Sequence, residues 1–406
     1  MIAIEEAQRR VWSACQRLDP VVSRLGDALG QVVAADIASG ENVPPFDNTA
    51  VDGYAVQAAD TTAAPVELDV AGTLSAGQAP NITVARGAAV RIMTGAPIPP
   101  GADAVAMVED SEALDGGSRV RLGRAVLAGD GVRRSGSDIK AGAVVVTAGT
   151  VLRPGHLGVL ASIGCGELSV YPRARVGVLS TGDELVDDGS ELTPGQIRES
   201  NRTMLLGAVA EANATAVDLG MARDDESVIT AAVKRGVASC DALLTSGGVS
   251  MGDFDLIKVV LDRLGDMQWM QIAIKPAKPF AFGLLKADDG RVVPVFGLPG
   301  NPVSSYVSFE LLARPALRLM MGHTAIGRPR VLAIADDGLA RHADGKVHFD
   351  RVHGAFGADG RWHVRTTGPQ GSHQLAASAA ANGLAVIPDG DGVAPGGTVE
   401  VLVLSL

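Results

Sequence analysis

The chain has 406 residues, of which 47% are hydrophobic and 20% are charged, a composition typical of a globular protein with more than one domain. Its 35 basic and 46 acidic residues give a formal net charge of −11, which argues against general binding to nucleic acid or to an anionic membrane. There is no apolar run of membrane-spanning length and no signal-peptide order at the start, and the three cysteines are widely separated. These features predict a cytoplasmic protein without a disulfide framework or a CxxC metal site.

The first part of the chain predicts a helix followed by short strands. Apolar residues recur at helical spacing over residues 5–18, and strand-like runs follow Pro20. From residue 44 to about 140, short alternating runs are separated by Gly and Pro, which predicts a β-domain. Residues 141–170 continue with strands and a short helical patch, GHLGVLASI.

At Arg173 the pattern changes to an alternation of strands and helices. The apolar run RVGVLST predicts a buried parallel strand, and helices alternate with strands up to about residue 322, so we predict a doubly wound α/β domain. From Arg328 onward, short strands and Gly/Asp turns predict a last β-domain. The predicted fold class is α/β plus β: a central doubly wound α/β domain with inserted β-domains and a C-terminal β-barrel-like domain.

Four polar loops are expected at the carboxyl ends of strands of the α/β domain, where open sheets bind their ligands. They are LSTGDEL (179–185), TSGGVSMGDFD (245–255), IKPAKPF (274–280) and GLPGNPVSS (297–305). TSGGVS can cradle a phosphate with backbone amides, and GLPGNPVSS leads into a helix with Asn301 or Gly300 near its N-cap and Pro302 in its first turn.

Charged residues in these loops predict a site for an anion and a divalent cation. Lys275 and Lys278 lie on a proline-stiffened loop of an acidic chain, which indicates a localised anion site. The carboxylates expected opposite them favour Mg²⁺, which binds a few carboxylates together with phosphate oxygens and water. These acids are Asp183, Glu184, Asp224, Asp225, Asp253 and Asp255.

Each feature also has a purely structural interpretation. Most Gly-rich loops are turns, Asp224 and Asp225 could cap the helix that follows them, and the two lysines could pair with surface acids. The segment RRSGSDIKAG (133–142) could be a β-turn, and the histidines show no metal-binding spacing. The coincidence of four polar loops at one sheet edge favours the ligand site.

Taken together, these strings resemble the molybdopterin molybdenumtransferases, the MoeA family that includes the E domain of gephyrin. The resemblance covers nearly the whole chain, with the motifs in the family's order. The matching motifs are PPFDNTAVDGYAV, RIMTGAPIPPGADAVAMVED, GDGVRRSGSDIKAG, LSTGDEL, TSGGVSMGDFD, IKPAKPFAFG and GLPGNPVSS.

The resemblance implies an elongated subunit of four domains. The expected segments are 1–20, a helix that packs with the α/β domain; 21–43 with 141–172, a β-rich linking and dimerisation domain; 44–140, an inserted β-domain; 173–325, the molybdopterin-binding α/β domain; and 326–406, the C-terminal β-domain. It also implies a homodimer whose active site is shared between subunits, with the upstream molybdopterin adenylyltransferase as a further expected partner.

The reaction that the resemblance implies converts adenylylated molybdopterin and molybdate into molybdenum cofactor and AMP, with Mg²⁺. The implied catalytic residues are Asp52, Thr94, Asp138, Glu184, Asp224 and Asp255, of which Glu184, Asp224 and Asp255 would hold the metal. The implied substrate-binding residues are Thr181, Gly182, Ser246, Gly247, Gly248, Ser250, Lys275, Lys278, Pro299, Asn301, Pro302, Ser304, Arg351 and Ser372. Some relatives carry a Lys where this chain has Gln271, which leaves the strength of binding or the choice of ligand open.

Three other functions remain in view at this point. The α/β domain alone resembles the adenylyltransferases of the same pathway, although the inserted β-segments and the DGYAV element argue against that activity. A family member can also act as a scaffold, but the long linker and second catalytic domain of such a protein are not recognisable here. A paralogue that handles tungstate is the third possibility, because molybdate and tungstate are nearly alike in size and charge.

Overall fold

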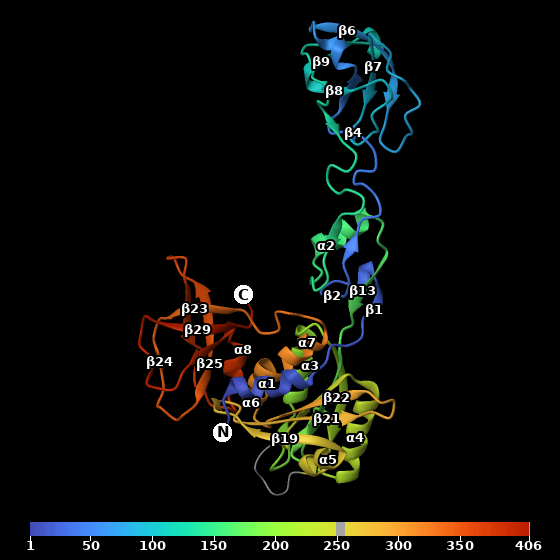
Figure 1. The fold of residues 1–406 in the computed structure, drawn as a ribbon. Helices are drawn as coiled ribbons and strands as arrows, with labels where there is room; N and C mark the ends of the chain where they lie inside the picture. The colour runs from blue at the N-terminus through green and yellow to red at the C-terminus, as the bar shows by residue number, and fades with distance from the viewer. Residues whose placement is uncertain (249–255, 406) are drawn as a thin grey trace. The chain divides into compact units, whose positions relative to one another are not determined.

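The computed structural model describes residues 1–248 and 256–405, and it divides into two compact units. The larger unit comprises Met1–Val21, Gly30–Ala34 and Ser169–Leu406, and the smaller unit comprises Val22–Leu29 and Ala35–Leu168. The chain therefore begins in the larger unit, passes through the smaller unit and returns to the larger one (Figure 1).

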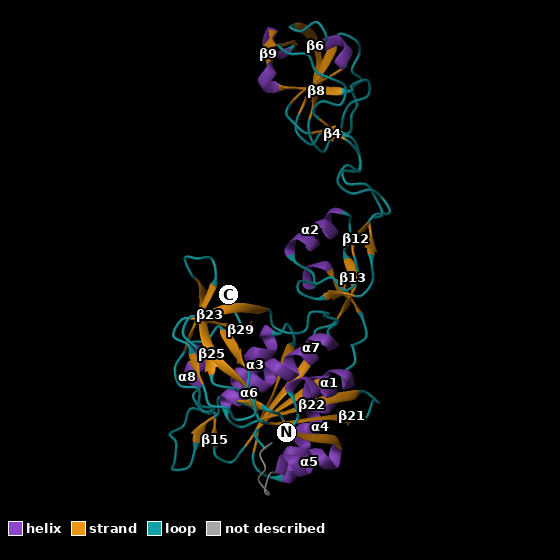
Figure 2. Ribbon diagram, turned by 60° about the vertical axis from the view of Figure 1, so that its left-hand side comes forward, coloured by secondary structure: helices purple, strands orange, loops and turns teal. Residues whose placement is uncertain are grey.

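A six-stranded sheet of order β17-β14-β18-β22-β21-β19 forms the centre of the larger unit (Figures 1 and 2). Its strands are β14 (Arg175–Thr181), β17 (Thr215–Ala222), β18 (Ala242–Ser246), β19 (Gly265–Gln271), β21 (Pro279–Lys286) and β22 (Val292–Leu298). β17, β14, β18 and β22 run parallel, whereas β21 is antiparallel to both of its neighbours. The carboxyl ends of β14, β17, β18, β19 and β22 therefore meet at one edge of the sheet, together with the start of β21.

Helices cover both faces of this sheet. One face carries α1 (Ile4–Ala14), α3 (Asn201–Glu211), α6 (Pro302–Ser308) and α7 (Arg314–Met320), and the other carries α4 (Glu226–Ser239) and α5 (Leu256–Leu264). Side chains of β14 alternate between the two layers, because Val176 and Val178 pack with the first set of helices and Leu179 packs with the second. β18 is buried along its whole length, as expected for a parallel strand covered on both faces.

The helix that closes the α/β part is interrupted by a π-helical segment, Phe309–Ala313, between α6 and α7. Within this segment Glu310 is only 3% exposed, and Arg328 donates hydrogen bonds of 2.8 and 2.9 Å to its carboxylate. A π-helical turn holds more residues than an α-helical turn and is often found where a helix carries a special side chain. Here it coincides with a buried ion pair.

The C-terminal part of the larger unit is a closed β-barrel in which β25, β26, β23, β29 and β27 are successive neighbours and β27 pairs back with β25. Its strands are β23 (Arg330–Ala335), β25 (Val347–Phe356), β26 (Trp362–Thr366), β27 (Gly383–Ile387) and β29 (Gly397–Val403). Strand β20 (Ile274–Lys275), from the loop that precedes β21, adds to β25. Shorter elements of the larger unit are β15 (Leu185–Val186), β16 (Ile197–Arg198), β24 (Leu339–Ala340), β28 (Gly392–Val393) and α8 (Leu375–Ala379).

The smaller unit is mostly β-structure, with a six-stranded sheet of order β8-β5-β7-β6-β10-β9. Its strands are β5 (Gly53–Val56), β6 (Val66–Leu74), β7 (Ala88–Ile92), β8 (Ala104–Met107), β9 (Ser111–Leu114) and β10 (Arg119–Leu122). Two-stranded pairs join β4 (Asn48–Thr49) to β11 (Val132–Arg133) and β3 (Ile37–Ala38) to β12 (Val144–Val146), and α2 spans Pro154–Ser162. Near the unit boundaries, β1 (Val21–Arg24), β13 (Glu167–Tyr171) and β2 (Val32–Val33) form a three-stranded sheet.

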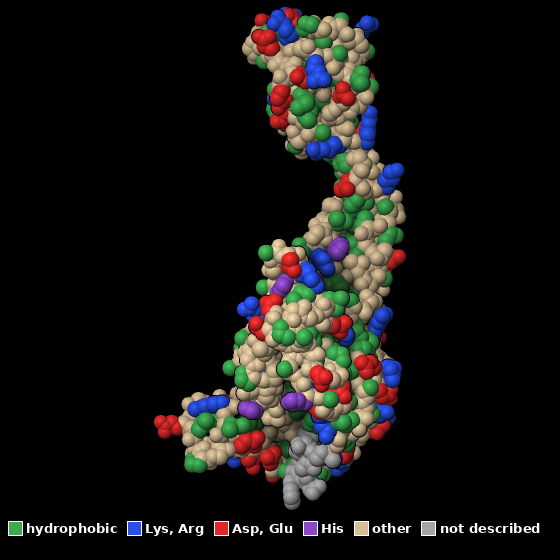
Figure 3. All heavy atoms as spheres, turned by 90° about the vertical axis from the view of Figure 1, so that its left-hand side faces the viewer, with side chains coloured by type: hydrophobic (Ala, Val, Ile, Leu, Met, Phe, Trp, Pro, Cys, Tyr) green, Lys and Arg blue, Asp and Glu red, His purple; other side chains and the backbone are tan. Residues whose placement is uncertain are grey.

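Acidic and basic side chains are interspersed on the face drawn in Figure 3. In the smaller unit, Glu67 illustrates this pattern because it receives hydrogen bonds from both Arg119 and Arg121. Cys15, Cys165 and Cys240 are all free thiols. Within residues 1–248 and 256–405, no helix is both long and apolar enough to cross a membrane.

The predicted fold class is confirmed: a sheet covered by helices on both faces is combined with β-domains and a C-terminal barrel. The first helix ends at Ala14 rather than near residue 18, because Cys15 already has extended backbone angles. The closing helix contains the π-helical segment that the apolar pattern did not indicate. Since the structure separates only two compact units, the finer division into four domains stays a prediction.

Candidate active site

A polar cleft lies at the sheet edge where the parallel strands end. It has a volume of about 340 Å³ and is bounded by loops that follow β14, β17, β18 and β22 and by the start of β21. Its walls are Thr181, Gly182, Glu184, Asp224, Gly247, Gly248, Pro279, Pro299, Gly300 and Asn301. The structure thus brings together eight of the predicted residues: Thr181, Gly182, Glu184, Asp224, Gly247, Gly248, Pro299 and Asn301. We call this hollow the edge cleft.

A second hollow of about 540 Å³ adjoins the edge cleft and shares Thr181, Glu184, Gly247, Gly300 and Asn301 with it. It adds two predicted residues, Ser246 and Pro302. It also adds side chains that the sequence did not single out, namely Ser180, Glu199, Asn201 and His373.

The edge cleft lies at the point where the strand order reverses. After β14 the chain forms β17 on one side of it and then β18 on the other, so the loops after β14 and β18 diverge there. Ligands of open α/β sheets bind at such switch points. At Gly247 the backbone has φ +100, and an added Cβ would lie 3.0 Å from the carbonyl oxygen of Thr181, so a side chain there would strain the backbone and crowd the loop after β14.

Two carboxylates of the edge cleft, those of Glu184 and Asp224, lie against the backbone of the loop that follows β14. The carboxylate of Glu184 lies over Gly182, where an added Cβ would come within 2.6 Å of Oε2. The N–H of Asp224 donates to Asp183 Oδ1 at 3.1 Å, and the N–H of Asp183 donates to Asp224 Oδ2 at 3.4 Å. This reciprocal pair ties the loop after β14 to the loop after β17.

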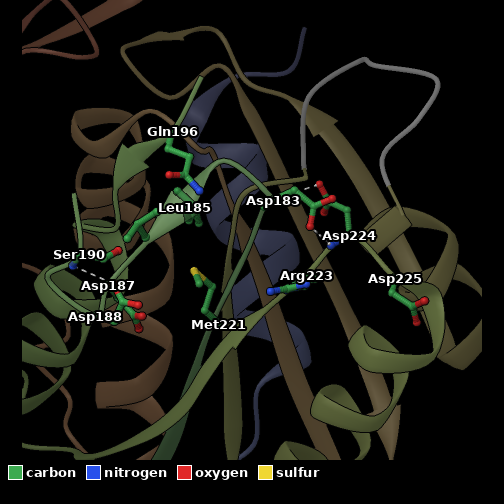
Figure 4. A pocket seen from close by; sticks show the side chains of 12 residues that line it. Asp183, Leu185, Asp187, Asp188, Ser190, Gln196, Met221, Arg223, Asp224 and Asp225 are labelled. Atoms are coloured by element: carbon green, nitrogen blue, oxygen red, sulfur yellow. Dashed lines mark hydrogen bonds between the residues drawn. The ribbon is translucent and has the colours of Figure 1, made fainter. Parts of the chain in front are cut away.

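Figure 4 shows Asp183 and Asp224 directed toward each other, while Asp225 points away from them. Asp225 is the N-cap of α4, because Oδ1 accepts hydrogen bonds from the N–H groups of Ser227 and Val228. Its pKa is held below the usual value, chiefly by the hydroxyl of Ser227. The helix-cap interpretation therefore applies to Asp225, whereas Asp224 borders the cleft.

The two predicted lysines are exposed and form no ion pair with the residues that the structure describes. Lys275 lies on β20 and is paired in register with His348 of β25. Close to it, burial raises the pKa of Asp350, against the charges of His348, Arg351 and Lys275, which act in the opposite direction. The alternative interpretation, in which these lysines pair with surface acids, is therefore not seen among the described residues.

Arg351 is 2% exposed and is bonded to the loop 369–374. Its guanidinium donates to the carbonyl oxygens of Pro369 and Gln374 at 3.0 Å, and to Gln370 Oε1 at 3.1 Å. The same loop bonds to α6, because the N–H of Val303 donates to the carbonyl of Ser372 at 3.1 Å. Arg351 therefore shapes the loop that carries Ser372, and a role of either residue toward molybdate stays a prediction. Ser304, also on α6, is 5% exposed.

The smaller unit holds the remaining predicted acids. Asp52 Oδ1 accepts hydrogen bonds from the N–H of Thr94 at 2.7 Å and from its hydroxyl at 2.8 Å, and the N–H is the main cause that lowers the pKa of Asp52. Asp138 is exposed, and its N–H donates to the carbonyl of Val43. Both loops of the smaller unit are therefore ordered by local bonds, with Asp52 ionised and exposed.

Some of the predicted and missed residues need separate mention. Ser250 and Asp255 lie outside the described residues, and among those described no group of three or more His, Cys, Asp or Glu side chains has the arrangement of a metal site. Gln271 ends β19 at the same sheet edge, and its carbonyl accepts from the N–H of Ile2. The sequence motifs did not include Glu199 and Asn201, which lie in the string IRESN just before and at the start of α3.

Comparison with known proteins identifies the family of this chain. The model of the MoeA N-terminal region (domain I and II) matches residues 2–164, that of a probable molybdopterin binding domain matches residues 177–319, and that of the MoeA C-terminal region (domain IV) matches residues 340–404. Molybdopterin molybdenumtransferase 2 of Mycobacterium tuberculosis is 40% identical over 400 residues, which is 96% of each chain. The molybdopterin molybdenumtransferase of Haemophilus influenzae is 38% identical and covers 93% of this chain and 92% of its own.

Solved structures agree with the family models. Two crystal structures of molybdopterin biosynthesis MoeA proteins from Pyrococcus horikoshii match with TM-scores of 0.81 and 0.79, at 32% and 30% identity, over 100% and 99% of this chain and 100% of each of theirs. The fold and the edge cleft thus define a multidomain protein built around an α/β domain of the molybdopterin-binding type. The chain belongs to the MoeA family.

Proposed function

We propose that this protein is a molybdopterin molybdenumtransferase that converts adenylylated molybdopterin and molybdate into molybdenum cofactor and AMP. The observation that carries the proposal is the edge cleft, in which the Gly247–Gly248 loop lies on the same cavity as Glu184 and Asp224. Such a combination of phosphate-binding backbone and carboxylates suits a phosphoanhydride substrate. Membership in a family whose curated relatives carry this name supports the same reaction.

In this proposal, fixed donors bind the phosphates of the substrate. Gly247 and Gly248 have φ values of +100 and +70, a conformation that most side chains would not permit. The N–H of Gly247 donates to the carbonyl of Leu298 at 3.2 Å, so the backbone donor that this turn would offer a phosphate is the N–H of Gly248. Donors held by the backbone need no reorganisation when negative charge develops on the departing AMP, which is why they stabilise a transition state effectively. The exposed Lys275 and Lys278 add positive charge that draws the anionic substrates toward this edge.

The carboxylates of the edge cleft fit a Mg²⁺ ion. Glu184 and Asp224 border one cavity, and Mg²⁺ is commonly bound by one or two carboxylates together with phosphate oxygens and water. These two residues would hold the ion, and Asp255 belongs to the same predicted set although it lies outside the described residues. A bound ion would supply charge neutralisation on the phosphate oxygens.

We further propose that the protein works as a homodimer in which Asp52 and Thr94 of one chain complete the edge cleft of the other. Asp52 is exposed and kept ionised by Thr94, so it is ready to accept a hydrogen bond or to bind a cation. The smaller unit also exposes apolar side chains that pairing would cover, with Val22 72% and Val144 52% exposed. The family resemblance supports this arrangement.

The experiment that tests the proposed function is incubation of purified protein with adenylylated molybdopterin, Mg²⁺ and molybdate, followed by measurement of AMP. We expect AMP release to require both the metal and molybdate. A parallel reaction with tungstate in place of molybdate measures the choice of oxyanion, which Gln271 leaves open. Hydrolysis of ATP without molybdate, and without any action on the adenylylated pterin, would refute the assignment.

A further inference from the structure

Asn201 joins two of the loops that form the edge cleft and its adjoining hollow. It is the first residue of α3 and is 9% exposed, on the wall of the hollow that contains Ser246 and Gly300. Its Nδ2 group donates to Ser246 Oγ at 2.8 Å and to the carbonyl oxygen of Gly300 at 2.7 Å. The end of β18 and the loop after β22 are therefore connected through a single amide group.

The orientation of this amide follows from its partners. A backbone carbonyl can only accept hydrogen bonds, so the group that faces Gly300 must be the NH₂ of Asn201 and not its oxygen. Both hydrogens of that NH₂ are then used, and Oδ1 is buried without a hydrogen-bond partner among the described residues. An unpartnered buried acceptor is destabilising, so this arrangement is kept at a cost to folding stability.

The bond from Asn201 determines which way the Ser246 hydroxyl is polarised. Because Oγ of Ser246 accepts from Asn201, its own hydrogen is free to be donated elsewhere. Ser246 is 3% exposed, and no acceptor for this hydrogen occurs in the described part of the chain. The hollow that Ser246 lines is the place where such an acceptor can bind.

The start of α3 is anchored independently of Asn201. Glu199 Oε1 accepts from the hydroxyl of Ser180 at 2.9 Å and from the N–H of Arg202 at 2.7 Å. These bonds connect the beginning of α3 to the carboxyl end of β14. Truncating Asn201 therefore removes the bridge to Ser246 and Gly300 while the helix start keeps its own attachment.

We propose that Asn201 is a positioning residue: by donating to Ser246 Oγ and to Gly300 O it makes the Ser246 hydroxyl a donor toward a phosphate oxygen of the ligand. The inference rests on the proposed function for the identity of the complete substrate. Its test does not, because binding of AMP alone measures the contact with a phosphate group.

The test is a double-mutant cycle with Asn201→Ala and Ser246→Ala, read as the Kd for AMP by isothermal titration calorimetry. A hydrogen bond to a charged group contributes about 1.5–3 kcal/mol, so each single change should weaken AMP binding about 10-fold or more. Because Asn201 acts through Ser246, the double variant should bind about as weakly as Ser246→Ala alone. Additive losses, or an unchanged Kd in Asn201→Ala, would overturn the proposal.

A matched control separates positioning from general damage. Asn213 also donates from Nδ2 to a backbone carbonyl, that of Gly30 at 2.7 Å, but it lies beyond the other end of α3. Asn213→Ala should leave the Kd for AMP unchanged, and an equal loss of affinity there would count against the proposal. If Asn201→Ala does not fold, the isosteric Asn201→Asp takes its place: the new carboxylate accepts the Ser246 hydrogen, so AMP binding should weaken at least 10-fold, and an unchanged Kd refutes the inference.

Failure of this inference can be distinguished from failure of the proposed function. If wild-type protein releases AMP from adenylylated molybdopterin but Asn201→Ala binds AMP normally, the function stands and the positioning role does not. If the AMP cycle behaves as expected but no molybdate-dependent AMP release occurs, the phosphate contact stands and the proposed reaction does not.

Discussion

Replacing Gly182 by Ala is expected to disable the edge cleft while the fold is retained. The added methyl carbon would lie 2.6 Å from Glu184 Oε2 and 2.8 Å from its carboxyl carbon, so the carboxylate has to move. The carboxylate of Glu184 lies at the end of a flexible side chain, so its displacement costs little folding free energy. The backbone at Gly182 has φ +148, which adds strain of about 1–3 kcal/mol for any side chain.

The expected effect on turnover follows from the displacement of the Glu184 carboxylate from the edge cleft. Removal of one preorganised electrostatic group commonly lowers kcat by about 10²–10³-fold. AMP release at saturating substrate measures kcat, and thermal unfolding of the same preparation measures the strain. Gly290→Ala is the matched control, because Gly290 has φ +89 and open space where its Cβ would lie, so it adds backbone strain without touching a carboxylate. A folded Gly182→Ala variant with normal kcat, or an equal loss of kcat in Gly290→Ala, would refute the reasoning.

Three further predictions address charge, assembly and pH. Lys275→Ala should weaken binding of the adenylylated substrate more than it lowers kcat, and the effect should shrink at high salt; an unchanged Kd at low and at high ionic strength would leave this lysine as a surface charge only. Mixing Asp52→Ala chains with Glu184→Ala chains should restore roughly a quarter of wild-type activity, because half of randomly exchanged dimers are mixed and each has one intact site; no recovery after confirmed exchange of tagged chains would contradict a shared site. Burial lowers the pKa of His323 to about 4, with the charges of Arg318 and Arg314 acting in the same direction, so the folded chain keeps it neutral while the unfolded chain protonates it below about pH 6.5. Stability should therefore fall as the pH drops from about 6.5 toward 4, and His323→Gln should remove that part of the loss; denaturant unfolding of both proteins at pH 7 and pH 5 measures the difference, and identical pH dependence would show that His323 is not its source.

The strands that carry the edge cleft could be predicted because a parallel strand buried on both faces reads as a continuous apolar run. RVGVLST became β14 with its buried residues from Val176 to Thr181, and the polar residues that follow it lie at the sheet edge. Since the carboxyl ends of parallel strands share one edge, the order of the chain was enough to bring Glu184 and Gly247 together. Local pattern and topology agree at these positions.

Residues that act through distant partners could not be predicted in the same way. Asn201 contacts Ser246 and Gly300, which are 45 and 99 residues away in the chain, so nothing in its local sequence shows which atoms it joins. Arg351 was predicted to contact substrate, but the carbonyl groups that its guanidinium engages carry no sequence signal. The π-helical turn around Glu310 escaped prediction because its apolar pattern is equally compatible with an uninterrupted α-helix.

The packing of α1 against the end of the α/β domain has a consequence for how the chain folds during its synthesis. Gln8 and Trp12 donate to the carbonyls of Leu311 and Leu312, partners 303 and 300 residues later in the chain. Residues 35–168 of the smaller unit form one continuous stretch that can fold as it emerges from the ribosome. By contrast, α1 is synthesised first but can pack only after nearly all of the α/β domain has been synthesised. Until the segment Phe309–Ala313 has been translated, the apolar stripe of Ile4, Ala7 and Val11 stays uncovered, and a truncated product that ends earlier would carry that stripe as an aggregation-prone surface.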